Sequence, residues 1–298
     1  MDRFLQAVKE TGVPFEEHCP LWKHSSFRIG GDADVGVFPR TREDLIAVLS
    51  LLHASNLPML VIGKGSNVVF SDEGFRGAVV FTEECKSVWR EGDGLVADAG
   101  ISLAALATFA AKEALTGAEF AHGIPGTLGG AVFMNAGAYD GCMAGICVKS
   151  QYYDLQTGKT VTLSGEEQNF SVRSSFYTDH PEAVILGASL SLSKGNEQEI
   201  REKMKELAAR RKASQPLEYP SAGSVFKRPA GHFAGKLIED CGLKGLTVGG
   251  AQVSQKHAGF IINQGGATAA DVRRLVEQIK ETVLEKTGVL LECEIRFL

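Results

Sequence analysis

Two glycine-rich loops are the first features of this sequence that could do chemistry. One is Gly-Lys-Gly-Ser-Asn, which lies between two β-like runs in VIGKGSNVVFSD, residues 61–72. Glycines let successive backbone N–H groups converge on one anion, and serine and asparagine side chains can add donors. The loop is neither a P-loop nor the dinucleotide fingerprint G-x-G-x-x-G, because Val68 holds the last glycine position and no helix is expected after it. We expect an anion-binding nest here, with a plain hairpin turn as the alternative.

The second glycine-rich loop is GIPGTLGGAVFMNAGAY, residues 123–139, which holds five glycines. Glycine at this density weakens helices and strands, so the bare backbone must serve a close approach to something else. Two anion-binding loops suit a ligand with a long phosphate-containing body, such as a dinucleotide. A buried structural crossover is the alternative.

A serine pair and a charged strand follow in the C-terminal part. SAGSVFKRP, residues 221–229, contains Ser221 and Ser224 around an Ala-Gly turn, where a hydroxyl commonly caps the backbone. No G-x-S-x-G elbow is present, so a hydrolase nucleophile is not expected. The chain ends in VLLECEIRFL, whose alternation predicts a strand with Glu292, Glu294 and Arg296 on one face. From the pattern alone, that face is the solvent-exposed side of an edge strand. The other face carries Val289, Leu291, Cys293, Ile295 and Phe297.

Four helices are predicted around these stretches. Thr41 with Asp44 and Thr268 with Asp271 have the spacing of capping boxes. The expected helices cover residues 41–55, 102–117, 197–214 and 268–288, and the second and fourth of them close at glycines. Short runs rich in Val and Ile are interpreted as strands at residues 57–63, 67–72, 77–83, 94–100, 152–158, 160–165 and 182–193.

This mixture predicts an α+β fold rather than regular β-α-β alternation, because short strands with glycine turns outnumber the helices. The prolines of QPLEYP, residues 215–220, break regular structure and mark a domain boundary.

Composition excludes several classes of function. The net charge is -5, and the densest basic run, residues 210–212, ends a predicted helix, so no nucleic-acid partner is expected. The N-terminus does not resemble a signal peptide, and no segment reaches the ~20 apolar residues of a membrane span. The six cysteines have no disulfide or zinc spacing, so we expect a cytoplasmic protein with free thiols and no metal site.

Four motifs in order resemble one family, the UDP-N-acetylenolpyruvoylglucosamine reductases. The motifs are SSFRIGGDADV, VIGKGSNVVFSD, EFAHGIPGTLGGAVFMNAGAY with the later FSVRSSF, and SAGSVFKRP with the terminal LLECEIRF. The resemblance covers nearly the whole chain. It implies an FAD-binding domain of the vanillyl-alcohol-oxidase (PCMH-type) class over residues 1–215, in two lobes of 1–80 and 81–215. A smaller α+β substrate-binding domain is implied over 216–298, with its last strand returning toward the flavin.

The resemblance also implies the activity. Non-covalently bound FAD is reduced by NADPH, and hydride then passes to the enolpyruvyl ether of UDP-N-acetylglucosamine, giving UDP-N-acetylmuramate for peptidoglycan synthesis. The enzyme is expected to be a monomer. The residues expected to contact FAD are Gly63, Lys64, Gly65, Ser66, Asn67, Gly123, Ile124, Pro125, Gly126, Gly129, Gly130, Ala131, Asn135, Gly137 and Arg296.

Three catalytic residues carry over from the family. Ser224 is expected to give a proton to C2, while Arg173 and Glu294 flank the substrate carboxylate as it gains enolate character. A guanidinium stabilises that charge well in a dry site. A serine is a poor acid, so its alkoxide needs a nearby cation, for which Lys227 is one candidate.

Two positions depart from the family pattern, and two other functions are open. Val172 stands where the family usually has Tyr, and Cys293 where it usually has Pro. The tyrosine-bearing loop of longer members is absent, which indicates the shorter subtype. A flavin oxidase with FAD attached through His122, or a nucleotide-binding regulator without catalysis, would share the glycine loops. Neither requires the set of Arg173, Ser224 and Glu294.

Overall fold

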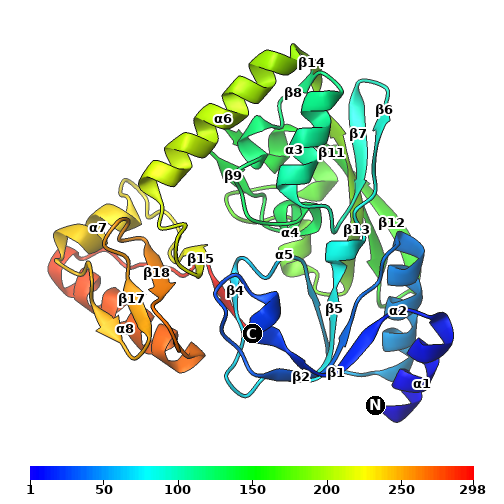
Figure 1. Cartoon of the computed structure of the whole chain (residues 1–298), viewed down its shortest axis with the longest axis horizontal. Coiled ribbons are helices and arrows are strands. Elements are labelled where there is room, and N and C mark those ends of the chain that lie inside the picture. Colours follow the sequence, from blue (N-terminus) through cyan, green and yellow to red (C-terminus); the bar gives the residue numbers. More distant parts are fainter. The chain divides into compact units, whose positions relative to one another are not determined.

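The computed structural model describes the chain from Met1 to Leu298 and divides it into two compact units (Figure 1). The first unit comprises Met1–Glu17, Val35–Lys64 and Gly77–Arg210, and the second comprises His18–Asp34, Gly65–Arg76 and Arg211–Leu298. Both units mix helices and strands, so the predicted α+β class is confirmed. The division reflects contacts rather than function, and the boundaries expected near residues 80 and 215 stay predictions.

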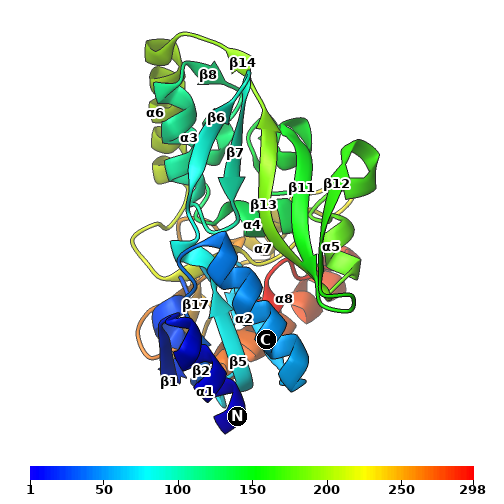
Figure 2. The ribbon, with the colours of Figure 1, turned by 90° about the vertical axis from the view of Figure 1, so that its right-hand side faces the viewer.

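A five-stranded antiparallel sheet lies at the centre of the first unit, in the order β12-β11-β13-β7-β6 (Figure 2). Its strands are β6 (Val88–Glu91), β7 (Gly94–Asp98), β11 (Cys147–Asp154), β12 (Lys159–Ser164) and β13 (Ala183–Ser191). Strand β13 is buried along most of its length, because side chains from both faces of the sheet enter apolar cores.

The alternation of side chains along these strands supplies two cores. Tyr152 and Ile185 belong to one core, which includes residues of helices α3 (Leu103–Lys112) and α4 (Leu128–Phe133). Their neighbours Tyr153 and Val184 belong to the other, with apolar residues of α1 (Asp2–Thr11) and α2 (Arg42–Ser55). The period of two along a strand therefore fixes which helices each residue meets.

The remaining elements of the first unit are short, apart from one long helix. They are β3 (Met59–Ile62), η2 (Thr82–Glu84), β8 (Leu115–Thr116), η3 (Glu119–Ala121), β9 (Gly137–Ala138), β10 (Gly141–Cys142), η4 (Met143–Gly145), η5 (Gly165–Gln168), α5 (Phe176–Asp179), β14 (Ser193–Lys194) and α6 (Glu197–Ser214). A further sheet has the order β1-β2-β5-β3, with β1 (Phe15–Pro20), β2 (Asp32–Val37) and β5 (Phe75–Phe81).

The second unit contains a four-stranded antiparallel sheet in the order β15-β18-β17-β16. Its strands are β15 (Ser221–Ser224), β16 (Thr247–Val248), β17 (Ala251–Val253) and β18 (Phe260–Asn263). Helices α7 (Ala234–Asp240) and α8 (Ala269–Thr287) contribute Ile238, Val272, Leu275, Val276, Ile279 and Val283 to its core. The unit also holds η1 (Leu21–His24) and the parallel pair β4 (Val68–Val69) and β19 (Arg296–Phe297).

The predicted capping boxes are confirmed at the starts of α2 and α8. In each, the threonine hydroxyl accepts from the N3 backbone and the N3 aspartate accepts from the cap backbone. The predicted glycine end of α8 is also confirmed, since Gly288 is left-handed with φ 72°.

Several element predictions need correction. The strand predicted at residues 152–158 is instead Cys147–Asp154, because residues 155–158 form the turn before β12. The helix from Ser102 ends at Lys112 rather than Gly117, because Ala114 turns left-handed with φ 53° and Leu115–Thr116 pair with β14. The terminal run forms a regular strand only at Arg296–Phe297, with an isolated bridge at Cys293. The second glycine loop contains a short helix, α4, which its glycines concealed. No helix of the structure combines the length and the apolar character needed to span a bilayer.

Candidate functional site

The two glycine-rich loops meet inside the first unit. Strand β3 ends one residue before Gly63, and a Cβ at Gly63 would collide with the side chain of Thr127 in the second loop. Position 63 therefore needs glycine because another part of the protein lies against it. The two loops therefore contact each other at this point.

The starts of two helices lie side by side at this junction. Ser102 and Thr127 are the N-caps of α3 and α4, and they form an antiparallel bridge. The Leu103 N–H donates to the Gly126 carbonyl at 3.0 Å, and the Leu128 N–H donates to the Ile101 carbonyl at 2.9 Å. Helix N-termini carry partial positive charge, so two of them together favour a phosphate group.

The glycines of the second loop do not all serve one purpose. At Gly129 an added Cβ would lie 2.9 Å from the Ala99 Cβ, so this glycine allows α4 to pack against the chain after β7. At Gly130 the Cβ would meet nothing nearer than the Thr127 hydroxyl at 3.6 Å, and the residue is exposed. Gly130 therefore leaves the surface at the start of α4 free of a side chain, while its N–H donates to the Thr127 hydroxyl at 3.4 Å.

One buried polar atom beside this loop lacks a protein partner. His122 directly precedes Gly123, and its Nδ1 is buried without a hydrogen bond. A buried polar atom without a partner costs about 1–3 kcal/mol, so this nitrogen requires a partner from outside the protein, such as a ligand. This orphaned atom, the paired helix starts and the side-chain-free surface at Gly130 together fit a phosphate-containing cofactor such as FAD.

A groove of about 660 Å³ lies beside the junction in the first unit. Its lining includes Lys64 and Ser102, which belong to the junction, and the apolar side chains of Ile101 and Phe109. Burial raises the pKa of Glu83 in its wall, while Lys64 opposes that shift. The volume is in the range of ligand pockets, so the groove could hold part of a dinucleotide.

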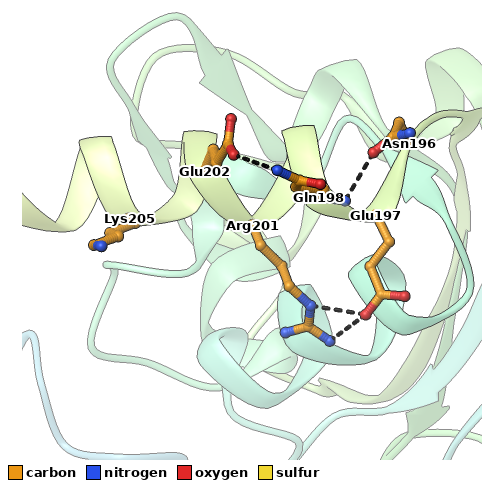
Figure 3. Close-up of a pocket in the computed structure, with 6 residues that line it drawn as sticks. All are labelled: Asn196, Glu197, Gln198, Arg201, Glu202 and Lys205. Atoms are coloured by element: carbon orange, nitrogen blue, oxygen red, sulfur yellow. Dashed lines mark hydrogen bonds and ion pairs between the residues drawn. The ribbon is translucent and has the colours of Figure 1, made fainter.

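A second hollow, along α6, has no features of a site (Figure 3). Arg201 pairs with Glu197 at 2.7 Å, and Gln198 donates to Glu202 at 3.0 Å, all on one exposed helix surface. These are the ordinary i,i+4 pairs of a solvated helix.

Arg173 lies at the tip of a tight turn in the first unit. The backbones of Ser171 and Ser174 exchange two hydrogen bonds, of 3.0 and 3.3 Å, across Val172 and Arg173. Arg173 has a left-handed backbone with φ 56°, and Val172 is 88% exposed. Left-handed residues other than glycine are costly and concentrate at functional sites. The Arg173 guanidinium donates to the Gly137 carbonyl at 3.5 Å.

The chain segments that carry Ser224 and Glu294 are paired in the second unit. The Glu294 N–H donates to the Val225 carbonyl at 2.8 Å, and the Lys227 N–H donates to the Glu292 carbonyl at 2.9 Å. The terminal segment thus runs antiparallel beside the residues that follow Ser224. Ser224 is exposed at the end of β15 and Glu294 is half-buried.

Lys227, the candidate cation for the serine alkoxide, is paired with an acidic residue in the structure. Its ammonium lies 3.3 Å from the Glu292 carboxylate, and both side chains are exposed. An exposed ion pair of this kind contributes little energy, so the role expected of Lys227 stays a prediction.

The second half of the first glycine loop is tied to the same terminal segment. The Asn67 amide donates to the Glu294 carbonyl at 3.1 Å, and the Arg296 N–H donates to the Asn67 carbonyl at 3.0 Å. Gly65 has φ 55°, and a Cβ there would collide with the His24 carbonyl. Asn67, expected to contact FAD, therefore also positions the backbone of Glu294.

Sequence reasoning missed two residues that organise this region. The Ser26 hydroxyl donates to the Ser221 carbonyl at 2.7 Å, and the buried Asn263 amide donates to the Phe27 carbonyl at 3.1 Å. Both bonds link the SSFRIGGDADV motif to strands at the other end of the chain. The SSFRIGGDADV motif could have indicated that these residues matter. No local sequence pattern, however, identifies Ser221 or Asn263 as their hydrogen-bond partners.

Comparison with known proteins defines first a class and then a family. A model described as "FAD binding domain" matches residues 33–164. The fold also resembles a BBE-like protein of Physcomitrella patens, with a TM-score of 0.52 at 16% identity over 64% of this chain and 44% of that one. The chain thus has the fold of the PCMH-type FAD-binding flavoproteins.

The particular family follows from closer relatives. A model described as "UDP-N-acetylenolpyruvoylglucosamine reductase, C-terminal domain" matches residues 215–298. The chain is 47% identical to the reductase of that name from Caldanaerobacter subterraneus, over 99% of this chain and 97% of that one. The Clostridioides difficile reductase is 47% identical over 99% and 96%. The crystal structure of the Thermus caldophilus reductase superposes with a TM-score of 0.80 at 34% identity, covering 96% and 98%. The chain belongs to the UDP-N-acetylenolpyruvoylglucosamine reductase family.

Proposed function

We infer that this chain is an FAD-dependent oxidoreductase of peptidoglycan precursor synthesis. It reduces the enolpyruvyl ether of UDP-N-acetylglucosamine to UDP-N-acetylmuramate with NADPH, as the family match over 99% of the chain indicates. The observation that supports the proposal is the hydrogen bond from the Glu294 N–H to the Val225 carbonyl, because Val225 directly follows Ser224 in the chain.

Several residues of the first unit are suitable for holding the cofactor. Gly63, Lys64 and the starts of α3 and α4 would take the pyrophosphate of FAD, and His122 Nδ1 would gain a hydrogen-bond partner. When bound, the flavin would supply the hydride for C3 of the enolpyruvyl group, with NADPH as the source. The orphaned His122 nitrogen and the side-chain-free surface at Gly130 support this placement.

The catalytic roles follow from the charge that develops on the substrate. Addition of hydride at C3 leaves negative charge at C2, delocalised into the adjacent carboxylate. The Arg173 guanidinium would stabilise that charge by a planar, two-pronged interaction. Glu294 is the second residue that we propose to act on the carboxylate. Ser224 gives its hydroxyl proton to C2. The alkoxide that this leaves needs a nearby cation, and Lys227, which is paired with Glu292 in the structure, is the candidate.

The oligomeric state, the location in the cell and the domain boundaries are further parts of the proposal. We propose that the enzyme acts as a monomer in the cytoplasm. We also propose that residues 1–215 bind FAD, with lobes at 1–80 and 81–215, and that residues 216–298 bind the substrate. The start of the C-terminal family match at residue 215 supports the second of these boundaries.

One assay separates the candidate functions. NADPH oxidation is followed with and without the enolpyruvyl sugar nucleotide, and the product is weighed by mass spectrometry. We expect oxidation to require the sugar nucleotide and the product to gain two hydrogens. Acid denaturation distinguishes the oxidase alternative, because covalent attachment through His122 would leave a yellow pellet, whereas non-covalent FAD leaves a yellow supernatant. Release of FMN alone, or oxidation indifferent to the sugar nucleotide, would contradict the proposal.

A further inference from the structure

A buried side chain, Asn135, bonds to the turn that carries Arg173. The Asn135 Nδ2 donates to the Ser171 carbonyl at 2.8 Å, and its Oδ1 accepts from the Ala144 N–H at 2.9 Å. Asn135 is 8% exposed. Both ends of its amide are therefore satisfied by backbone groups inside the protein.

These two partners determine which residue can stand at position 135. One end of the side chain faces an acceptor and the other faces a donor, and a carboxamide is the group that offers one of each in this geometry. The Asn135 backbone is left-handed with φ 42°, a conformation that asparagine tolerates better than most residues. Asparagine is therefore favoured at position 135 for two reasons: it tolerates the left-handed backbone, and its side-chain amide matches both hydrogen-bond partners.

The segment that contains Asn135 also accepts a hydrogen bond from the side chain of Arg173. The Gly137 carbonyl, two residues after Asn135, accepts from the Arg173 guanidinium at 3.5 Å. Gly137 is paired with Cys142 in the β9–β10 hairpin, whose Tyr139 donates to the Leu207 carbonyl of α6 at 2.8 Å and stacks 4.7 Å from the Arg210 guanidinium. The β9–β10 hairpin, which contacts Arg173, is therefore also bonded to α6.

We propose that Asn135 is a positioning residue for the reduction, which acts by fixing the Ser171–Ser174 turn and through it the guanidinium of Arg173. This rests on the proposed role of Arg173. A left-handed residue at the tip of a tight turn persists only when the surroundings hold it, and Asn135 supplies that hold on the backbone. A misplacement of about 1 Å in a catalytic group can reduce the rate by roughly 10²-fold.

The first test compares Asn135→Asp and Asn135→Ala with Asn169→Asp in the FAD-loaded enzyme. Asn169 is the matched control, because it is also left-handed, with φ 45°, but is exposed. We expect both changes at position 135 to slow flavin oxidation by the enolpyruvyl substrate by roughly 10- to 100-fold, and to slow it more than they slow flavin reduction by NADPH. FAD content is measured in each variant and the rates are given per bound flavin, because Asn135 is also among the residues expected to contact FAD. Asn169→Asp keeps both rates.

The pH dependence of Asn135→Asp gives a readout that simple loss of structure would not. An ionised carboxylate repels the Ser171 carbonyl, whereas a protonated one donates to it and still accepts from Ala144. Burial raises the pKa of such a carboxyl group, so protonation falls within reach between about pH 8 and 5. We expect the rate of Asn135→Asp relative to the unmodified enzyme to rise as pH falls, and that of Asn135→Ala to stay flat.

Arg173→Ala separates failure of the positioning role from failure of the proposed catalytic role. If Asn135 acts through Arg173, Asn135→Ala adds little further loss in the Arg173→Ala background, so the two changes are strongly non-additive. Equal losses in both backgrounds, or a flat pH ratio for Asn135→Asp, would overturn the positioning role while leaving the proposed function standing. Full activity of Arg173→Ala would instead remove the catalytic role on which the inference rests.

Discussion

Ser224 is the residue whose replacement tests the proposed chemistry most directly. It lies at the end of a short strand, and the only lysine that follows it closely is paired with Glu292. The environment therefore does not make the serine a strong acid in the free protein. Its role depends on the basicity of the carbanion that forms at C2 of the substrate.

Replacing Ser224 is expected to affect one half-reaction only. Hydride transfer from NADPH to flavin needs no proton on carbon, so Ser224→Ala should retain flavin reduction. Flavin oxidation by the enolpyruvyl substrate should fall by about 10²–10⁴-fold, the usual contribution of general acid catalysis. Ser224→Cys should recover part of the rate, since a thiol also donates a proton. Stopped-flow absorbance of the flavin measures each half-reaction separately.

Lys227→Ala tests in the same experiment whether that lysine stabilises the alkoxide. If it does, we expect flavin oxidation by the enolpyruvyl substrate to slow while flavin reduction by NADPH is kept. Less than a several-fold effect on either half-reaction would instead leave Lys227 as one member of an exposed ion pair with Glu292. Equal slowing of both half-reactions by Ser224→Ala would make the serine a positioning residue.

The start of helix α8 is determined by a few identifiable side chains. The capping box of Thr268 and Asp271 begins α8, and Asp72 from the first glycine motif adds a second set of bonds there. The two Asp72 carboxylate oxygens accept from the Ala269 and Ala270 N–H groups at 2.7 and 3.0 Å. A carboxylate at a helix start satisfies amides that the helix itself leaves open, and it opposes the positive end of the helix dipole.

Removing this carboxylate should destabilise the protein measurably. We expect Asp72→Ala to lower the free energy of unfolding by about 1 kcal/mol, within the range found for lost N-caps. Glu73→Ala is the control, since Glu73 is the exposed neighbour and its carboxylate makes no bond to α8. Urea titration followed by circular dichroism gives both values. Equal midpoints for the two variants would show that Asp72 does not cap the helix.

The reactivity of the cysteines depends on the whole molecule, because burial decides it. All six are free thiols, and four of them are buried. Burial raises the pKa of Cys85 to about 12, with Asp98 adding to the shift, and burial also raises the pKa of Cys147 to about 12. Cys85 also donates to the Pro39 and Thr41 carbonyls at 3.2 Å.

Alkylation of the folded protein should therefore be selective. At pH 8 a thiol with a pKa near 12 has on the order of 10⁻⁴ of its population as the reactive thiolate. We expect the less buried Cys142 to be modified first, while Cys85 and Cys147 react only after unfolding. Peptide mapping by mass spectrometry after timed alkylation checks this order, with a sample in urea as the reference. Early modification of Cys147 in the folded protein would contradict the burial found here.

The sequence by itself determined the features that depend on neighbours within a turn or two. Thr41 with Asp44 and Thr268 with Asp271 begin helices where their spacing predicted, because a capping box closes over three residues. The ordered motifs also indicated the family, since each motif is a local run of residues that can be read directly. The end of α3 was predicted wrongly because the pairing of Leu115–Thr116 with β14 overrides local helix propensity.

Only the tertiary structure decided which distant residues meet. Nothing local in SAGSVFKRP or LLECEIRF indicates that the Glu294 and Val225 backbones are bonded, that Asn67 reaches Glu294, or that Lys227 is drawn to Glu292. The same is true of Asn135, which read as a loop residue near the cofactor and in the fold also holds the Ser171 carbonyl. These contacts depend on how strands and turns far apart in the chain pair and pack, and that outcome is a property of the whole chain rather than of any short stretch.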